Sequence, residues 1–112
     1  MTRRAAPRHL REPTKAWWRS VIARYDLQEH EERLLTLACE SFDRATEARE
    51  ALEREGTHYV DRFGAPKSHP AVALERDSRL SFARLVRQLD LQGHEAPELE
   101  DDFLRRLQSL TD

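Results

Sequence analysis

The stretch RFGAPKSHPAV, residues 62–72, decides how the chain folds, because it combines a turn with the start of a helix. Gly64 favours the turn, and Pro66 keeps the backbone that follows extended. Pro70 has a φ near the helical value and lacks a backbone N–H, which suits the first position of a helix. His69 precedes a proline and is restricted to the extended backbone that an N-cap residue requires. We therefore predict an α-helix that begins at Pro70.

The segment that follows, residues 70–91, has the apolar periodicity of an amphipathic helix. Its apolar stripe consists of Ala71, Leu74, Ser78, Phe82, Leu85 and Leu89. The opposite half of the helix carries Arg76, Arg79, Arg84 and Arg87. These arginines form either an ordinary solvated face or a surface that binds a polyanion such as DNA.

The longest predicted helix covers residues 29–55 and carries an apolar stripe about half its circumference wide. One explanation is a single neighbouring helix within the chain, together with the high helix propensity of alanine. The other explanation adds a contact with a second subunit, formed by Leu35, Ala38, Phe42 and Ala45. Gly56 is expected to end this helix as a left-handed cap. Residues 57–68 are rich in β-formers and predict a short hairpin or an extended loop.

Residues 1–12 are basic, contain prolines and lack apolar periodicity, which predicts a flexible arm. Thr14 is expected to cap a short helix, in which Trp17 and Trp18 contribute to the core or, alternatively, provide a platform on which bases stack. Residues 13–94 are then the helical core and oligomerisation domain.

The C-terminal residues 95–112 are predicted to contain a last amphipathic helix with an acidic start. Its apolar stripe is Leu99, Phe103, Leu107 and Leu110. The acidic residues at positions 98 and 100–102 lie at its N-terminal end. With 36% charged residues, only 3 Gly and 112 residues in all, the composition favours a mainly α, small helical domain of about four helices.

Charge is segregated along the chain. Residues 1–19 hold six basic side chains and one acidic side chain, whereas residues 26–55 hold ten acidic and four basic ones. Residues 95–112 are again acidic, which indicates separate partners for separate ends. The basic N-terminal set is the first candidate for DNA contact: Arg3, Arg4, Arg8, Arg11, Lys15 and Arg19.

Several kinds of chemistry have no sequence signature here. There is no Gly-rich phosphate loop, the five histidines lack metal-ligand spacing, and the only cysteine, Cys39, cannot build a zinc cluster. His69 has no partner carboxylate or nucleophile at a telling spacing. We therefore expect a binding or assembly protein without metal or cofactor, not an enzyme. A single cysteine and the absence of an apolar run of membrane-spanning length fit a reducing cytoplasm.

The order of several segments resembles the small subunit of tailed-phage terminases. These segments are HLREP at 9–13 before AWW at 16–18, LTLACE at 35–40, EREG at 53–56, KSHPAV at 67–72 and LVRQLDL at 85–91. The resemblance covers most of the chain, and it rests on the ordered set and its spacing.

This resemblance implies a helical subunit without catalytic residues that assembles into a homo-oligomeric ring. Such a ring recognises double-stranded viral DNA and hands it to the large subunit, the ATPase and nuclease, in the cytoplasm of the infected bacterial host. The sequence has no helix-turn-helix pattern, so sequence-specific readout by a recognition helix is not expected.

The charge segregation and the compact C-terminal stripe suggest where the large subunit docks, namely at Leu99, Asp101, Asp102 and Phe103. Two alternatives to a packaging subunit stay open at this point. One is a small dimeric DNA-binding regulator or antitoxin-like module, and the other is a helical adaptor without nucleic acid.

Overall fold

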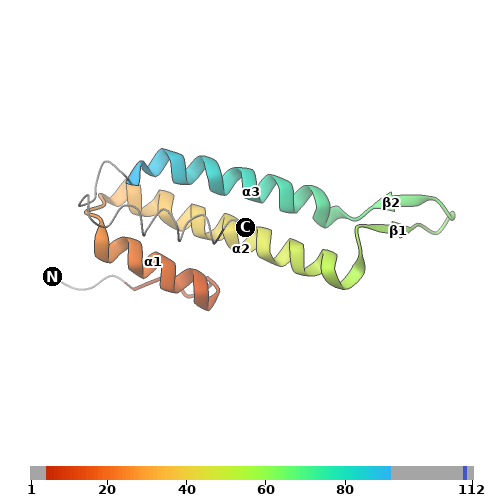
Figure 1. Ribbon diagram of the computed structural model, residues 1–112, viewed down its shortest axis with the longest axis horizontal. Helices are drawn as coiled ribbons and strands as arrows, with labels where there is room; N and C mark the ends of the chain where they lie inside the picture. Colours follow the sequence, from red (N-terminus) through yellow and green to blue (C-terminus); the bar gives the residue numbers. More distant parts are fainter. Residues whose placement is uncertain (1–4, 92–109, 111–112) are drawn as a thin grey trace.

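The protein is mainly helical, with one small β-hairpin, in a computed structural model that describes residues 5–91 and residue 110. The elements are α1 (Glu12–Arg24), α2 (Glu29–Glu55), β1 (His58–Val60), β2 (Pro66–Ser68) and α3 (Pro70–Leu89). Helices α2 and α3 run antiparallel beside each other, and α1 packs along the first half of α2 (Figure 1). The hairpin projects beyond the far ends of α2 and α3 (Figure 1).

The turn and helix start within residues 62–72 are confirmed. Gly64 has a φ of 81°, in the region that favours glycine. The Asp61 carboxylate accepts hydrogen bonds from the backbone N–H groups of Phe63 and Ala65, each at 2.9 Å, and so closes the turn. His69 is the N-cap of α3, because its Nδ1 accepts from the backbone N–H of Ala71 at 3.0 Å.

The C-terminal ends of the two long helices, α2 and α3, differ slightly from expectation. Gly56 has a positive φ of 81°, but its ψ of 171° places it outside the left-handed helical region. Helix α3 ends at Leu89, because Asp90 adopts the left-handed conformation with φ 48° and ψ 54°. Apart from these two helix ends, the segment α2–hairpin–α3 lies where the local signals of the sequence place it.

The start of α1 is a correction. The sequence suggested Thr14 as the N-cap, whereas the helix begins at Glu12 with Arg11 as its N-cap residue. Pro13 occupies the first turn, where its missing N–H leaves no helical hydrogen bond unmade, so the helix can begin three residues earlier. Thr14 lies inside this first turn and is buried.

The core lies where the three helices meet. The two tryptophans are core residues: Trp17 packs on Phe82 of α3 with ring centroids 5.9 Å apart. Trp18 is 2% exposed, and its Nε1–H donates to Thr36 Oγ1 of α2 at 3.2 Å. Completing the cluster are Leu10, Val21, Tyr25, Leu35, Ala38, Cys39, Phe82, Leu89 and Leu91.

The fourth predicted helix lies outside the described residues, except for Leu110. Leu110 is helical and packs, partly buried, against the core. Within the described part of the chain, no helix has both the length and the apolarity needed to cross a membrane.

Candidate nucleic-acid interface

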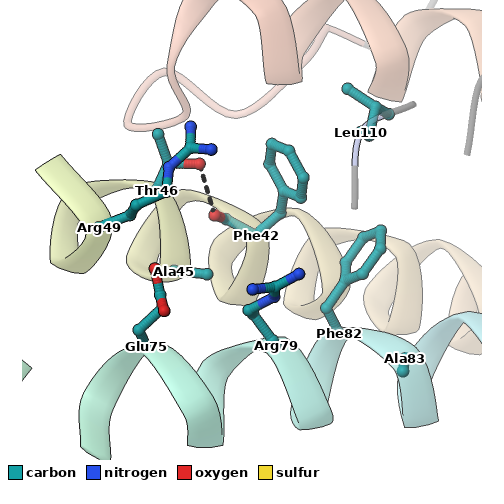
Figure 2. A pocket seen from close by; sticks show the side chains of 9 residues that line it. All are labelled: Phe42, Ala45, Thr46, Arg49, Glu75, Arg79, Phe82, Ala83 and Leu110. Carbon is teal, nitrogen blue, oxygen red and sulfur yellow. Dashed lines mark hydrogen bonds between the residues drawn. The ribbon is translucent and has the colours of Figure 1, made fainter. Parts of the chain in front are cut away.

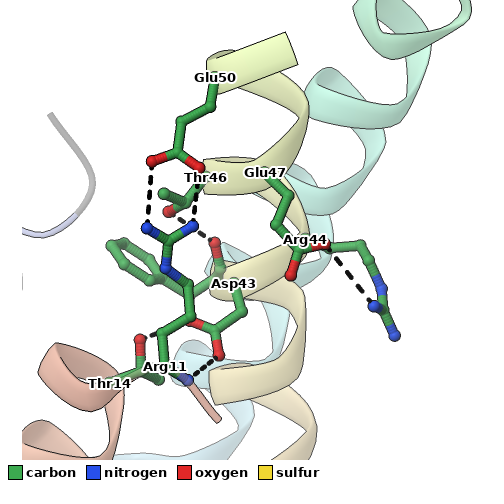
Figure 3. A network of polar contacts seen from close by, with 8 residues as sticks. Arg11, Thr14, Asp43, Arg44, Thr46, Glu47 and Glu50 are labelled. Atoms are coloured by element: carbon green, nitrogen blue, oxygen red, sulfur yellow. Dashed lines mark hydrogen bonds and ion pairs between the residues drawn. The ribbon is translucent and has the colours of Figure 1, made fainter. Parts of the chain in front are cut away.

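The basic N-terminal segment is docked on the acidic helix α2. Both Nη atoms of Arg11 donate to the Glu50 carboxylate, at 2.8 and 3.0 Å, as Figure 3 shows. The backbone N–H of Arg11 donates to Asp43 Oδ2 at 2.8 Å. His9 Nε2 lies 2.6 Å from Glu40 Oε2. Residues 9–11 were expected to belong to a flexible arm, and these contacts with α2 correct that expectation.

Opposite charges explain this docking. The side-chain hydrogen bonds from Arg11 hold the pKa of Glu50 below its usual range, although partial desolvation opposes them. The same hydrogen bonds with Glu50 raise the pKa of Arg11. Part of the charge segregation along the sequence therefore reflects contacts within the chain, and Arg11 is engaged with a carboxylate.

We expect the substitution Arg11→Gln to raise the pKa of Glu50 towards that of an ordinary glutamate. A carboxyl with a lowered pKa stabilises the fold above the unfolded pKa, and this stabilisation is lost as the pH falls through the folded pKa. Carbon-detected NMR titration of the Glu50 carboxyl measures the change. Arg33→Gln is the control, because Arg33 pairs with Glu29 in the first turn of α2 and should leave Glu50 unchanged. An unchanged Glu50 pKa in Arg11→Gln would refute the pairing.

The other members of the N-terminal basic set have different surroundings. Lys15 Nζ lies 3.2 Å from Glu12 Oε1, and its side chain is mostly covered. Arg8 and Arg19 are exposed, and neither forms an ion pair with another residue among 5–91. Arg3 and Arg4 lie outside the described residues.

The arginines of α3 also separate into different groups. Arg76 pairs with the neighbouring Asp77 at 3.2 Å on the surface. Arg79 lines a pocket between α2 and α3. Arg84 and Arg87 are exposed and have no ion-pair partner in the described part of the chain. Being three residues apart, they lie on one face of the helix with Cβ atoms about 5–6 Å apart.

The pocket between α2 and α3 has a volume of about 360 Å³. Phe42 and Phe82 belong to its apolar lining, with ring centroids 5.3 Å apart. Figure 2 shows Glu75 and Arg79 reaching from α3 towards α2. Neither a cysteine nor a histidine is among its described lining residues, and no group of three metal-ligating side chains occurs among residues 5–91 and 110.

The four predicted subunit-contact residues are divided by the structure. Phe42 and Ala45 line this pocket and are partly accessible. Leu35 and Ala38 are 0% exposed, because α1 and α3 cover both sides of this part of α2. They are core residues of the chain itself, which corrects their assignment to a subunit contact. Cys39 is equally buried, and desolvation raises the pKa of its thiol, as expected for a structural cysteine.

Asp43 is an important residue that the sequence did not single out. It is 6% exposed and accepts a hydrogen bond from Thr14 Oγ1 at 2.5 Å, in addition to the one from the Arg11 backbone. A carboxylate of α2 thus stands at the N-terminus of α1, where the helix dipole favours a negative charge. The available signal was its position four residues after Cys39, on the apolar side of α2.

The predicted docking residues for a large subunit lie outside the described residues: Leu99, Asp101, Asp102 and Phe103. Their role stays a prediction.

No protein-family model, no curated protein and no solved structure matches this chain.

Proposed function

We propose that this protein is a DNA-binding, non-catalytic subunit of the phage terminase small-subunit type. In this proposal it forms a homo-oligomeric ring, recognises double-stranded viral DNA and recruits or regulates the large terminase subunit during genome packaging. The observation that carries the proposal is the pair Arg84 and Arg87, exposed on one face of α3 without an ion pair to any described residue. Arg8 and Arg19 add two more exposed guanidinium groups.

The proposed mechanism is electrostatic. A guanidinium group donates two parallel hydrogen bonds to a phosphate and releases condensed counterions when it binds. Repetition of the same arginines around a ring multiplies these contacts without any change in the chain. Phosphate contacts carry no sequence information, so we expect tight binding at low salt with weak sequence preference.

The double variant Arg84→Gln/Arg87→Gln tests the proposal. Removing two phosphate contacts per bound subunit should lower affinity for a mixed-sequence duplex by roughly tenfold or more near 0.1 M salt. It should also flatten the slope of log K against log salt by about 2 for each subunit that contacts the duplex. Fluorescence anisotropy of a labelled duplex over a range of salt concentrations gives both quantities.

The matched control is Arg44→Gln/Arg54→Gln, which also removes two arginines but does so on the acidic helix α2, where each has a neighbouring carboxylate. This variant should bind DNA as the parent protein does. Equal losses of DNA affinity in the two double variants would show that only the total charge matters and would contradict a DNA contact through α3.

The mass of the particle in solution distinguishes the proposal from its alternatives. A closed assembly of many subunits favours packaging, whereas a dimer that binds DNA would favour the regulator or antitoxin-like module. A protein that shows no salt-sensitive DNA binding would be an adaptor of another kind.

A further inference from the structure

The β-hairpin is the most exposed apolar feature among the described residues. All six residues of β1 and β2 are exposed, and no helix covers either strand. Phe63, in the turn between the strands, is 80% exposed, and the Arg62 guanidinium lies over its ring at 4.9 Å. Tyr59 and Val60 add further exposed apolar surface on β1. An isolated two-stranded ribbon is marginally stable in water, so this hairpin gains stability from any surface that covers it.

A groove on α2 has the complementary properties. It has a volume of about 690 Å³, and Leu37 is the exposed apolar residue in it, at 49% exposure. Its other lining residues are Glu29, Glu32, Arg33, Thr36 and Glu40. Three carboxylates and one guanidinium give this surface a negative balance. A second hollow of about 280 Å³ adjoins it, shares Leu37 and Glu40, and extends to α3.

The two surfaces cannot meet within one chain. The groove lies between residues 29 and 40 of α2, and the hairpin leaves the far end of the same helix after Glu55. At 1.5 Å per residue, the fifteen residues from Glu40 to Glu55 already separate the two surfaces by about 22 Å. The hairpin moreover points away from the helices (Figure 1).

We propose that the hairpin of one copy docks into the Leu37 groove of the next copy. Phe63 then packs on Leu37, while Arg62 and Lys67 face the carboxylates around the groove. A second copy is the occupant because one chain carries two complementary surfaces. The hairpin is basic and apolar, and the Leu37 groove is acidic and apolar. This inference deepens the proposed function and rests on its homo-oligomer.

Such a contact joins two different surfaces and is therefore heterologous. Every added copy presents a free hairpin at one side and a free groove at the other, so the contact repeats. It closes into a ring when the rotation between copies divides a full turn, and it gives a filament otherwise. Neither Leu35 nor Ala38 takes part, in agreement with their burial.

The test uses two full-length variants, Phe63→Asp and Leu37→Asp, separately and mixed. Both side chains are largely exposed, so circular dichroism should show both variants folded. Sedimentation velocity without DNA should give the mass of one chain, 13.2 kDa, for each variant alone. An equimolar mixture should give a dimer, because one variant keeps an intact groove and the other an intact hairpin.

Leu74→Asp is the matched control, because Leu74 is 47% exposed and lies outside the proposed contact. It should keep the mass of the parent assembly. The inference is wrong if the parent protein is monomeric, if Leu37→Asp keeps the assembly, or if the mixture stays monomeric. Loss of assembly in Phe63→Asp alone would indicate a hairpin-to-hairpin contact instead.

The same samples separate this inference from the proposed function. A parent assembly that follows the mixing pattern but does not bind DNA supports the contact and refutes the DNA-binding role. A monomer that binds DNA in a salt-dependent way refutes the contact and leaves the DNA-binding role standing.

Discussion

Trp18→Ala is expected to lower the free energy of unfolding by about 4 kcal/mol, the range typical for removal of a large buried aromatic side chain. Trp18 is 2% exposed and lies between α1 and α2 in the core. Its removal leaves a cavity and also takes away the partner of Thr36 Oγ1. Since domains of this size are stable by only about 5–15 kcal/mol, the loss is a large part of the total. Urea denaturation followed by circular dichroism measures it.

Trp18→Phe is the control that separates packing from hydrogen bonding. It keeps an aromatic ring in the core and removes the Nε1–H donor. It should therefore lower the free energy of unfolding clearly less than Trp18→Ala does. A change of less than about 1 kcal/mol in Trp18→Ala would contradict the placement of Trp18 in the core, because such small changes are typical of surface positions.

Asp43→Ala is expected to lower the free energy of unfolding by about 3 kcal/mol, because it removes two hydrogen bonds to a charged acceptor and leaves their donors without it. One of these donors, Thr14 Oγ1, is buried between α1 and α2. The other is the backbone N–H of Arg11, the N-cap residue of α1. The first turn of α1 should therefore lose its attachment to α2, with faster amide hydrogen exchange there.

The control for Asp43→Ala is Glu47→Ala, one turn further along the same helix. Glu47 is exposed and lies 4.0 Å from Arg44, so its removal should change stability by less than about 0.5 kcal/mol. Thr14→Val/Asp43→Ala replaces both partners of the buried hydrogen bond and should recover part of the loss. Equal stabilities for Asp43→Ala and Glu47→Ala would show that the Asp43 network does not hold α1.

The elements that follow local rules could be predicted from the sequence. Gly64, His69 and Pro70 each act on the backbone within two residues, and the turn and the start of α3 lie where these residues indicate. The long helix α2 was predicted with its observed ends, residues 29 and 55, because its apolar period continues without a proline or glycine up to Gly56. Periodicity and capping determine such elements without reference to the rest of the chain.

Contacts between distant residues could not be predicted in this way. Arg11 and Asp43 are 32 residues apart, so the sequence does not show that they pair. Only the position of Asp43 on the apolar side of α2 indicated that this carboxylate is buried. For the same reason, the sequence did not show that Leu35 and Ala38 pack inside the chain itself. A broad apolar stripe on α2 fits a single neighbouring helix as well as several neighbours, and it does not distinguish α1 from another subunit. The structure assigns α1 and α3 to this part of the stripe.

The structure also changes how the charge of the chain is interpreted. Arg11 and His9 interact with carboxylates of α2, so the N-terminal segment is less available for DNA than its composition suggested. Arg84 and Arg87 are exposed, lie on one face of α3 and have no ion pair among residues 5–91. In the proposed assembly, the hairpin and the Leu37 groove join the copies, and the arginines of α3 are repeated around them.

Sedimentation velocity of the protein with a fluorescently labelled duplex, at low and at high salt, tests whether an assembly of many subunits binds DNA through its arginines. We expect that at low salt the label sediments with a particle of many subunits, and that high salt releases the label while the particle persists. A label that sediments alone at low salt beside an intact particle, or a bound label unaffected by salt, would contradict a DNA-binding assembly held to phosphate by arginines.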